Sequence, residues 1–299
     1  MSNLPAPSPN DVVILAGART PQGKLLGQLA PLTSVELGAH AVKHAVQRSG
    51  VAPEEVQHVV LGQVILAGAG QNPARQVAIK AGLPWNTTAE IVNKVCLSGL
   101  NAVIHAARLI RLGDADVVVA GGQESMTHAP HVARGVRQGK SFGALKLEDT
   151  LERDGLVDSF DGVSMGTLTD GPNSDLGISR EQQDEVAAAS HQRAAKAQED
   201  GIFAQEIAPI EIPQRKGDPV VVDTDQGIRP EATVETLAKL RPVFLKENGT
   251  ITAGNSSPIS DGAAAVVLAS RAYAEKHGLD YLAVVGKAGQ TAGPDNSLH

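Results

Sequence analysis

The only cysteine of the chain, Cys96, lies where an apolar run gives way to a helical pattern. Ile91, Val92 and Val95 predict a strand before it, and the pattern over 97–112 predicts a helix after it. Unpaired backbone N–H groups and the helix dipole at a helix start favour a thiolate over a thiol. A thiolate is the strongest nucleophile among unmodified side chains near neutral pH. Cys96 is therefore a candidate catalytic nucleophile; the alternative is a small buried side chain, the commoner role of a free cysteine.

Histidines and glycines elsewhere match parts of two known kinds of site, but neither pattern is complete. His40 and His44 are four residues apart, and His128 and His131 form a second pair, yet no cysteine or carboxylate cluster completes a ligand set. The segment 68–73 begins like a dinucleotide-binding glycine loop, but it ends in proline and lacks the acidic residue that should follow. We expect neither a metal site nor a bound nicotinamide cofactor.

The first third of the chain alternates strand and helix patterns, which predicts a layered α/β fold. Short apolar runs predict strands at 12–15, 59–61, 91–95 and 116–120. Amphipathic patterns with start and stop residues predict helices at 33–50, 74–81 and 97–112. Strands joined through helices need crossover connections, so we expect a mostly parallel sheet covered on both faces.

The pattern changes after residue 121. Strand signals become weak over 122–254, glycines and charges are frequent, and one clear helix follows the capping residue Ser179. Apolar residues at 263–268 predict the return to the sheet, and a further strand is expected at 282–286. Because the chain ends in turn-forming residues soon after this strand, we expect it to be truncated.

The composition excludes several classes of function. The chain has 299 residues, of which 42% are hydrophobic and 20% charged, as in folded soluble proteins. A net charge of −7 argues against binding to nucleic acid. A single cysteine fits a reducing compartment, residues 1–9 lack a secretory signal, and no uncharged apolar run is long enough for a bilayer. We expect a cytoplasmic protein with no nucleic acid or membrane partner.

Six phrases of the sequence, in the same order, resemble the thiolase family. They are Gly17–Pro21, Gly70–Gln76, Asn93–Leu100, Ala120–Met126, Lys239–Pro242 and Thr252–Ser257. The resemblance implies two similar α/β halves, each a layered α/β/α unit with a mixed five-stranded sheet, and a loop domain inserted in the first half. The expected divisions are an N-terminal half at 1–121 and 255–281, an inserted loop domain at 122–254, and the start of the C-terminal half at 282–299.

The resemblance also implies an activity. Family members join two acetyl-CoA molecules into acetoacetyl-CoA or run the reverse thiolysis, in fatty acid metabolism, as dimers or tetramers of one chain. The position of Cys96 carries the acyl group as a thioester, and its backbone N–H is one donor of an oxyanion hole. Coenzyme A is a substrate, so no separate cofactor is expected. The positions that match coenzyme A contacts are Leu156 and Met165 in the pantetheine channel, Arg229 near the nucleotide, and Thr236, Ala253 and Ser257.

The sequence departs from the family pattern at three places. Ser164 stands where many members have histidine, which leaves the acyl-chain preference open, and Pro258 replaces a common glycine. The family's catalytic histidine and second cysteine, which activate the nucleophile and move the proton of the enolising acetyl group, are not among these residues. We therefore expect this chain alone to lack measurable thiolysis.

Two other functions stay open. A decarboxylating condensing enzyme similar to ketoacyl synthases would use the same cysteine position, and would accept malonyl thioesters. A non-catalytic module would bind coenzyme A or a partner subunit while Cys96 stayed inert. Stoichiometric labelling of Cys96 by iodoacetamide favours the enzyme.

Overall fold

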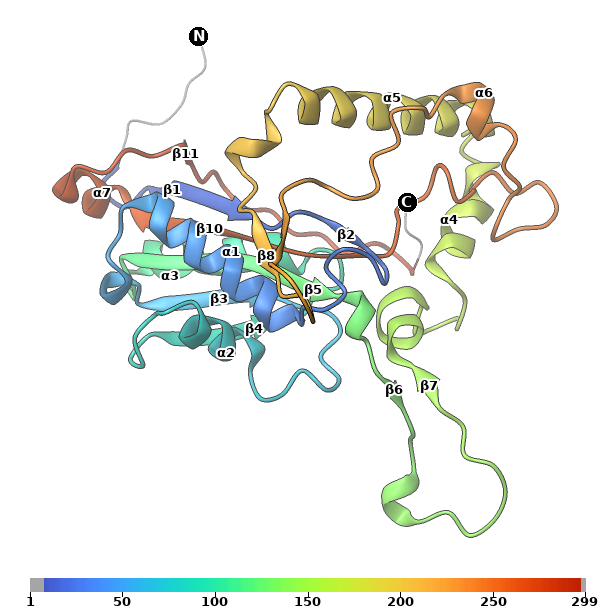
Figure 1. Cartoon of the computed structure of the whole chain (residues 1–299), viewed down its shortest axis with the longest axis horizontal. Helices are drawn as coiled ribbons and strands as arrows, with labels where there is room; N and C mark the ends of the chain where they lie inside the picture. The colour runs from blue at the N-terminus through green and yellow to red at the C-terminus, as the bar shows by residue number, and fades with distance from the viewer. Residues whose placement is uncertain (1–7, 297–299) are drawn as a thin grey trace.

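The computed structural model describes residues 8–296 and has a seven-stranded mixed sheet at its centre (Figure 1). The segment expected to lack a secretory signal lies largely outside the described residues. The strand order is β11-β1-β10-β5-β3-β4, with β2 paired to β10. The bounds are β1 Val12–Arg19, β2 Gly23–Lys24, β3 His58–Gly62, β4 Thr88–Val92, β5 Val117–Ser125, β10 Ser260–Ser270 and β11 Ala283–Val284.

The sheet is mixed because of β10. β3 runs parallel to β4 and β5, whereas β10 lies between β1 and β5 and is antiparallel to both. The expectation of a mostly parallel sheet from strand and helix alternation is therefore wrong. The chain reaches β10 after a long excursion outside the sheet and not through a single crossover helix. The mixed five-stranded sheet implied by the family resemblance is present as β1, β10, β5, β3 and β4, and the two-residue strands β2 and β11 bring the total to seven.

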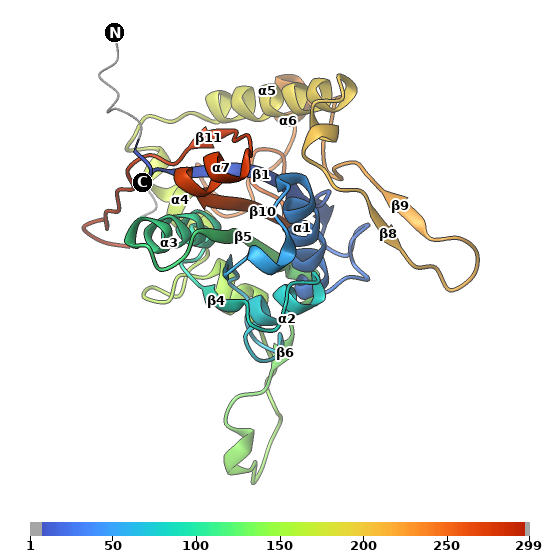
Figure 2. The same cartoon turned by 90° about the vertical axis from the view of Figure 1, so that its left-hand side faces the viewer.

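Helices cover both faces of the sheet, as expected from the sequence (Figure 2). Alternation along β3 shows how: Val59 and Leu61 pack in the cluster that includes α1 and α2, and Val60 packs in the cluster that includes α3. The predicted capping box of α1 is present, with Thr33 as its N-cap. The helix bounds are α1 Ser34–Ser49, α2 Pro73–Lys80, α3 Ser98–Leu112 and α7 Arg271–His277, with a 3₁₀ turn at Pro53–Glu55.

The apolar composition of α3 would suit either a membrane or the core of a folded protein. The segment Val95–Leu112 is long and apolar enough to cross a membrane by length and composition. In this structure Ala102, Ala106 and Ile110 of α3 are buried against the sheet. This apolar face belongs to the core of the α/β fold.

The residues between β5 and β10 lie outside the central sheet. β5 continues to Ser125, four residues past the expected domain boundary at 121, and β10 begins at Ser260. The short strands β6 and β7 form the base of an arm that projects from the molecule (Figure 1). The elements of this region are the 3₁₀ turns Met126–His128, Val136–Gln138 and Phe203–Gln205, β6 His131–Val132, β7 Glu148–Asp149, the π-helix η4 Leu151–Leu156, α4 Met165–Asn173, α5 Arg180–Glu199, β8 Ile210–Ile212, β9 Val220–Val222 and α6 Val234–Leu237.

One arginine fastens this region to the sheet. The guanidinium of Arg19, at the end of β1, donates to both carboxylate oxygens of Asp225 at 2.7 and 2.9 Å and to Glu206 at 2.8 Å. The paired geometry with Asp225 matches the planar fork of the arginine head group. Segments close to β8 and β9 are thereby held at the end of β1.

Candidate active site

The loop that carries Cys96 begins earlier than the sequence indicated. β4 ends at Val92, so the predicted strand over 91–95 is wrong in its last three residues. The chain then turns, and Val95 has φ +49°. A β-branched residue in the left-handed region is strained, at a cost of roughly 1–3 kcal/mol. The apolar character of Val95 hid this turn from strand patterning.

Polar side chains on both sides of the turn hold it in place. Asn93 Oδ1 accepts a hydrogen bond from the Val95 backbone N–H at 3.0 Å. Ser98 Oγ accepts from the Lys94 N–H at 2.8 Å and donates to the Val95 carbonyl at 2.6 Å. The strained backbone before Cys96 is therefore fixed by three hydrogen bonds.

The helix that follows starts later than expected. α3 begins at Ser98 with Leu97 as its N-cap, so Cys96 lies before the helix and not in its first turn. The N–H groups of Leu97 and Ser98 donate to the carbonyls of Lys94 and Val95, both at 3.1 Å. Because the dipole effect falls off within the first turn, α3 acts less strongly on the Cys96 sulfur than a place inside that turn would imply.

A glycine on β3 lets α3 approach the sheet. A Cβ added at Gly62 would lie 2.6 Å from the backbone carbon of Ser98 and 2.7 Å from the backbone nitrogen of Gly99. Only a residue without a side chain fits under the start of α3 at this point. The close contact brings the Cys96 turn over the end of the sheet.

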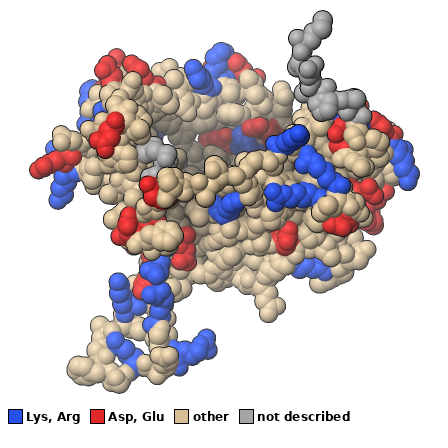
Figure 3. Space-filling model, turned by 180° about the vertical axis from the view of Figure 1, so that it is seen from behind, with Lys and Arg blue, Asp and Glu red and all other residues tan. Residues whose placement is uncertain are grey.

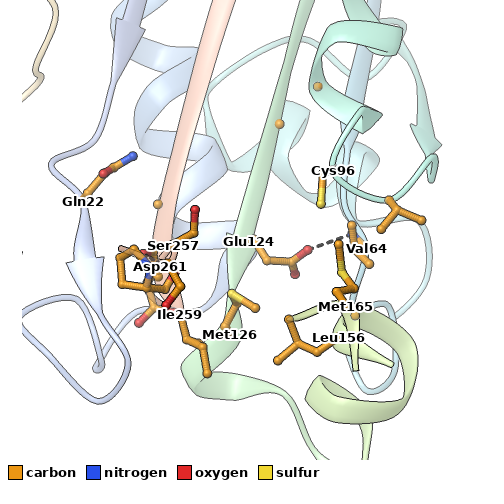
Figure 4. A pocket seen from close by; sticks show the side chains of 18 of the residues that line it. Gln22, Val64, Cys96, Glu124, Met126, Leu156, Met165, Ser257, Ile259 and Asp261 are labelled. Carbon is orange, nitrogen blue, oxygen red and sulfur yellow. Dashed lines mark hydrogen bonds between the residues drawn. The ribbon is translucent and has the colours of Figure 1, made fainter. Parts of the chain in front are cut away.

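Cys96 is exposed and lines a cavity of about 930 Å³. Small-molecule sites typically measure roughly 300–1,000 Å³. Figure 4 shows the Cys96 side chain directed into this space, with Met165 and Leu156 on the facing wall. A sulfur enclosed by aliphatic neighbours would have contradicted the nucleophile, and the structure does not show one.

Four of the seven residues singled out in the sequence come together here. Cys96, Leu156, Met165 and Ser257 all line the cavity. They come from four segments: the turn before α3, the last residue of η4, the first residue of α4, and the loop before β10. Ser164 caps α4, its Oγ accepting from the Thr167 N–H at 3.2 Å.

The loop that carries Ser257 is fixed by one hydrogen bond to α5 and by another within the loop. Asn255 Nδ2 donates to Asp184 Oδ1 at 2.9 Å, and Asn255 Oδ1 accepts from the Thr252 N–H at 2.7 Å. Asp184 is itself buried and receives a hydrogen bond from Arg180. The small residues of this loop thus form an ordered turn whose end faces the cavity.

The other three predicted positions do not line the cavity. Thr236 is exposed on α6, and its hydroxyl donates to the Thr233 carbonyl at 2.9 Å. The backbone N–H of Arg229 donates to His191 Nδ1 at 3.2 Å, which places Arg229 against α5. Ala253 is exposed, in the loop that packs beside α6. These residues lie along α5 and α6, outside the cavity.

Glu124 was not singled out from the sequence, although it lies in one of the six phrases quoted above. Its Oε2 accepts from the backbone N–H groups of Val64 at 2.8 Å and Ile65 at 3.3 Å. Its Oε1 is buried and, among the described residues, has no hydrogen-bond partner. Burial raises the pKa of Glu124 to about 7, the two N–H groups act against this, and the nearby charge of Asp261 adds to it.

Other titratable groups around the cavity are few. Besides Cys96 and Glu124, the cavity is lined by the titratable side chains of Arg19 and Asp261. None of the histidines in residues 8–296 lines it. Within the same residues, no three His, Cys, Asp or Glu side chains gather as a metal site.

The comparisons with known proteins all indicate the same family. The family model described as the thiolase N-terminal domain matches residues 12–272. A protein of Mycolicibacterium smegmatis named "Probable acetyl-CoA acetyltransferase" is 51% identical over 286 residues, which cover 96% of this chain and 74% of that protein. An "Acetyl-CoA acetyltransferase" of Cupriavidus necator is 51% identical over 95% of this chain and 72% of its own length. One of Pseudomonas aeruginosa is 49% identical over 96% of this chain and 73% of its own length.

Proposed function

This chain belongs to the thiolase family, and from this premise we propose that it interconverts two acetyl-CoA with acetoacetyl-CoA plus CoA. The observation that carries the proposal is the position of Cys96, the only cysteine of the chain, on the wall of a cavity of about 930 Å³. A thiolate can exchange with a thioester at little cost, because the two leaving groups are thiolates of similar basicity.

In the first step the sulfur of Cys96 attacks the carbonyl carbon of acetyl-CoA. A bond forms between Sγ and this carbon, the bond from the carbon to the CoA sulfur breaks, and CoA leaves as a thiolate that takes up a proton. In the second step another acetyl-CoA loses a proton from its methyl carbon, which balances the proton that the departed CoA thiolate takes up. The resulting enolate carbon bonds to the acetyl carbonyl carbon as the bond from that carbon to Cys96 Sγ breaks, which forms acetoacetyl-CoA and restores the Cys96 thiolate. Thiolysis follows the same steps in reverse.

The cavity supports the binding of a pantetheine arm. Its wall opposite Cys96 carries the apolar side chains of Met126, Leu156 and Met165 (Figure 4). Arg229 is a cation on the side of α5 and α6, where the phosphates of the nucleotide would be offset by positive charge. We propose coenzyme A as a substrate and no separate cofactor.

The test is the covalent intermediate itself. The chain is incubated with acetyl-CoA, and its intact mass is compared with that of Cys96→Ser after the same treatment. We expect the mass of one acetyl group on the native chain and none on the variant. A native chain that binds CoA but takes up no acetyl group, while iodoacetamide labels Cys96 normally, contradicts an acyltransferase.

A second prediction concerns catalytic turnover by the 299-residue chain alone. Thiolysis is followed as the loss of acetoacetyl-CoA in the presence of CoA. We expect single-turnover acylation of Cys96 without measurable thiolysis, because the histidine and second cysteine implied by the family resemblance are not in this sequence. Sustained thiolysis by this chain alone contradicts that expectation.

We also propose a cytoplasmic homo-oligomer, a dimer or a tetramer, that acts in fatty acid metabolism without nucleic acid or membrane partners. The arm between β6 and β7 supports self-association. Its apolar side chains Val136, Phe142, Leu145 and Leu147 are 43–93% exposed, and its Lys and Arg side chains stand apart from the body of the protein (Figure 3). A second copy would cover this apolar surface.

A further inference from the structure

We propose that Asn93 is a positioning residue for acetyl transfer, which holds the backbone of Val95 in the conformation that directs the Cys96 sulfur into the cavity. This inference rests on the proposed acyltransferase function. It assigns a role to a side chain that does not touch the substrate but sets where the nucleophile points.

The backbone of Val95 is in a conformation that its side chain disfavours. Its φ of +49° lies in the left-handed region, where a β-branched residue is strained. The peptide that joins Val95 to Cys96 sets the direction in which the Cys96 side chain leaves the chain. Relaxation of Val95 to an extended or right-handed conformation would therefore turn the sulfur away from the cavity and from Met165 on the facing wall (Figure 4).

Both polar ends of the Asn93 amide act against this relaxation. Its Oδ1 accepts from the Val95 backbone N–H, two residues further along the chain, at 3.0 Å, which closes a tight turn. Its Nδ2 donates to the Val64 carbonyl at 3.2 Å. Ser98 Oγ holds the other side of the same residue by donating to the Val95 carbonyl. Val95 is thus bound at its N–H by Asn93 and at its carbonyl by Ser98.

The segment to which Asn93 binds is itself fixed in the fold. The Val64 backbone N–H donates to Glu124 Oε2 of β5 at 2.8 Å (Figure 4). The neighbouring Gln63 is buried, and its Nε2 donates to Ser34 Oγ at the start of α1 at 3.1 Å. The turn that carries the nucleophile is thereby tied to an anchored segment at the end of β3.

Asn93 acts from outside the cavity of Cys96. It is not among the residues that line this cavity, and it lines a separate one of about 500 Å³. Val64 lines both cavities and lies between them. An effect of Asn93 on acetyl transfer must therefore pass through the backbone that carries Cys96.

The test is a double-mutant cycle on Asn93→Ala and Val95→Gly. Asn93→Ala removes both hydrogen bonds of the amide. Val95→Gly removes the strain, because glycine adopts a φ of +49° without steric cost. If Asn93 acts by holding a strained residue, its loss matters less once the strain is gone.

Asn72→Ala is the matched control. Asn72 is also exposed, and its amide makes the same two kinds of bond: Oδ1 accepts from the Arg75 backbone N–H at 3.2 Å, and Nδ2 donates to the Ala89 carbonyl at 3.0 Å. Its own φ is +40°. It caps α2, however, and lines neither cavity.

The measurement is the rate at which acetyl-CoA acetylates Cys96, divided by the rate of iodoacetamide alkylation at the same pH. Because the sulfur is exposed, the small alkylating reagent reaches it in either orientation, and the ratio reports the orientation. We expect Asn93→Ala to lower the ratio about tenfold in the native chain and about threefold or less in Val95→Gly. Asn72→Ala should lower the melting temperature and leave the ratio unchanged.

The outcomes separate the two proposals. A native chain that is alkylated but never acetylated contradicts the acyltransferase function, and the role of Asn93 fails with it. If the native chain is acetylated, an unchanged ratio in Asn93→Ala overturns the role of Asn93 alone. An equal fall in Asn72→Ala, or in both backgrounds of the cycle, overturns it too. If Asn93→Ala does not fold, as its melting curve shows, Asn93→Ser takes its place with the same direction of effect, because a hydroxyl closes such a turn more weakly.

Discussion

At the scale of single residues, Glu124 lines the cavity and also makes the stability of the fold depend on pH. Its pKa is raised from 4.5 to about 7 in the folded protein, chiefly by burial. The folded state therefore binds this proton more tightly than the unfolded chain. The resulting stabilisation is fully present below about pH 4.5 and is lost as the pH rises through about 7.

Glu124→Gln should remove this dependence. Between pH 5 and pH 8 the Glu124 carboxyl group is expected to cost the native chain up to about 3 kcal/mol in free energy of unfolding. The variant lacks the ionisation and should lose correspondingly less over the same range. Urea unfolding of both proteins at the two pH values measures the difference, and an equal loss in both would contradict the raised pKa.

At the scale of elements, the position of the nucleophile depends on how closely α3 approaches β3. The start of α3 rests on Gly62, and Cys96 is carried by the turn just before it. A helix displaced from the strand would carry the turn with it. The close contact therefore sets both core packing and the position of the sulfur.

Gly62→Ala is expected to push α3 away from β3. The added methyl group meets backbone atoms of Ser98 and Gly99, which cannot rotate aside, so we expect a loss of roughly 1–3 kcal/mol in stability and slower acetylation of Cys96. Gly171→Ala is the control, because its added Cβ meets nothing within 4 Å inside α4. Alanine there should be neutral or slightly stabilising. Chemical unfolding and intact-mass acetylation measure both effects.

Elements with local signals were predictable from the sequence, and those set by distant contacts were not. The caps Thr33 and Ser179 satisfy N–H groups three residues away, so the starts of α1 and α5 follow from nearby residues. The direction of β10 depends on pairing with β1 and β5, which no local pattern encodes. Val95 misled because its side chain favours strands while its backbone is held in a turn.

The candidate site likewise contains one residue that was predictable from the sequence and one that depends on distant contacts. Cys96 was identified because its residue type is unique in the chain. Glu124 could not be, since its chemistry depends on backbone N–H groups some 60 residues away in sequence and on its burial in the folded chain. A carboxyl group in a strand gives no sequence signal of an unpaired oxygen.

At the scale of the whole molecule, Arg19 joins the sheet to the residues that lie between β5 and β10. Its contacts with Glu206 and Asp225 span nearly 190 and just over 200 positions of sequence. The Arg19 and Asp225 side chains are 19% and 10% exposed, so the pair is only partly screened by solvent. This ion pair is expected to contribute to the docking of the β8 and β9 hairpin region.

Arg19→Lys should loosen this attachment. Lysine keeps the charge but cannot bond both oxygens of Asp225 in parallel, so we expect a loss of roughly 1–3 kcal/mol and faster proteolysis between residues 200 and 230. Lys196→Met breaks an exposed helical pair with Asp200 and should change stability by less than about 0.5 kcal/mol. Equal effects of the two substitutions would show that the Arg19 geometry adds nothing.

The chain leaves the central sheet after Ser125 and re-enters it at Ser260, and these two points are neighbours because Asp261 pairs with Ser125. The span from 126 to 259 is therefore an insertion whose two ends lie at one place on the central sheet. Lengthening or shortening such an insertion costs little loop-closure entropy, since the pairing of β5 with β10 already joins its ends. The residues of this span that line the cavity, such as Leu156 and Met165, can thus vary while the strands of the central sheet stay in register.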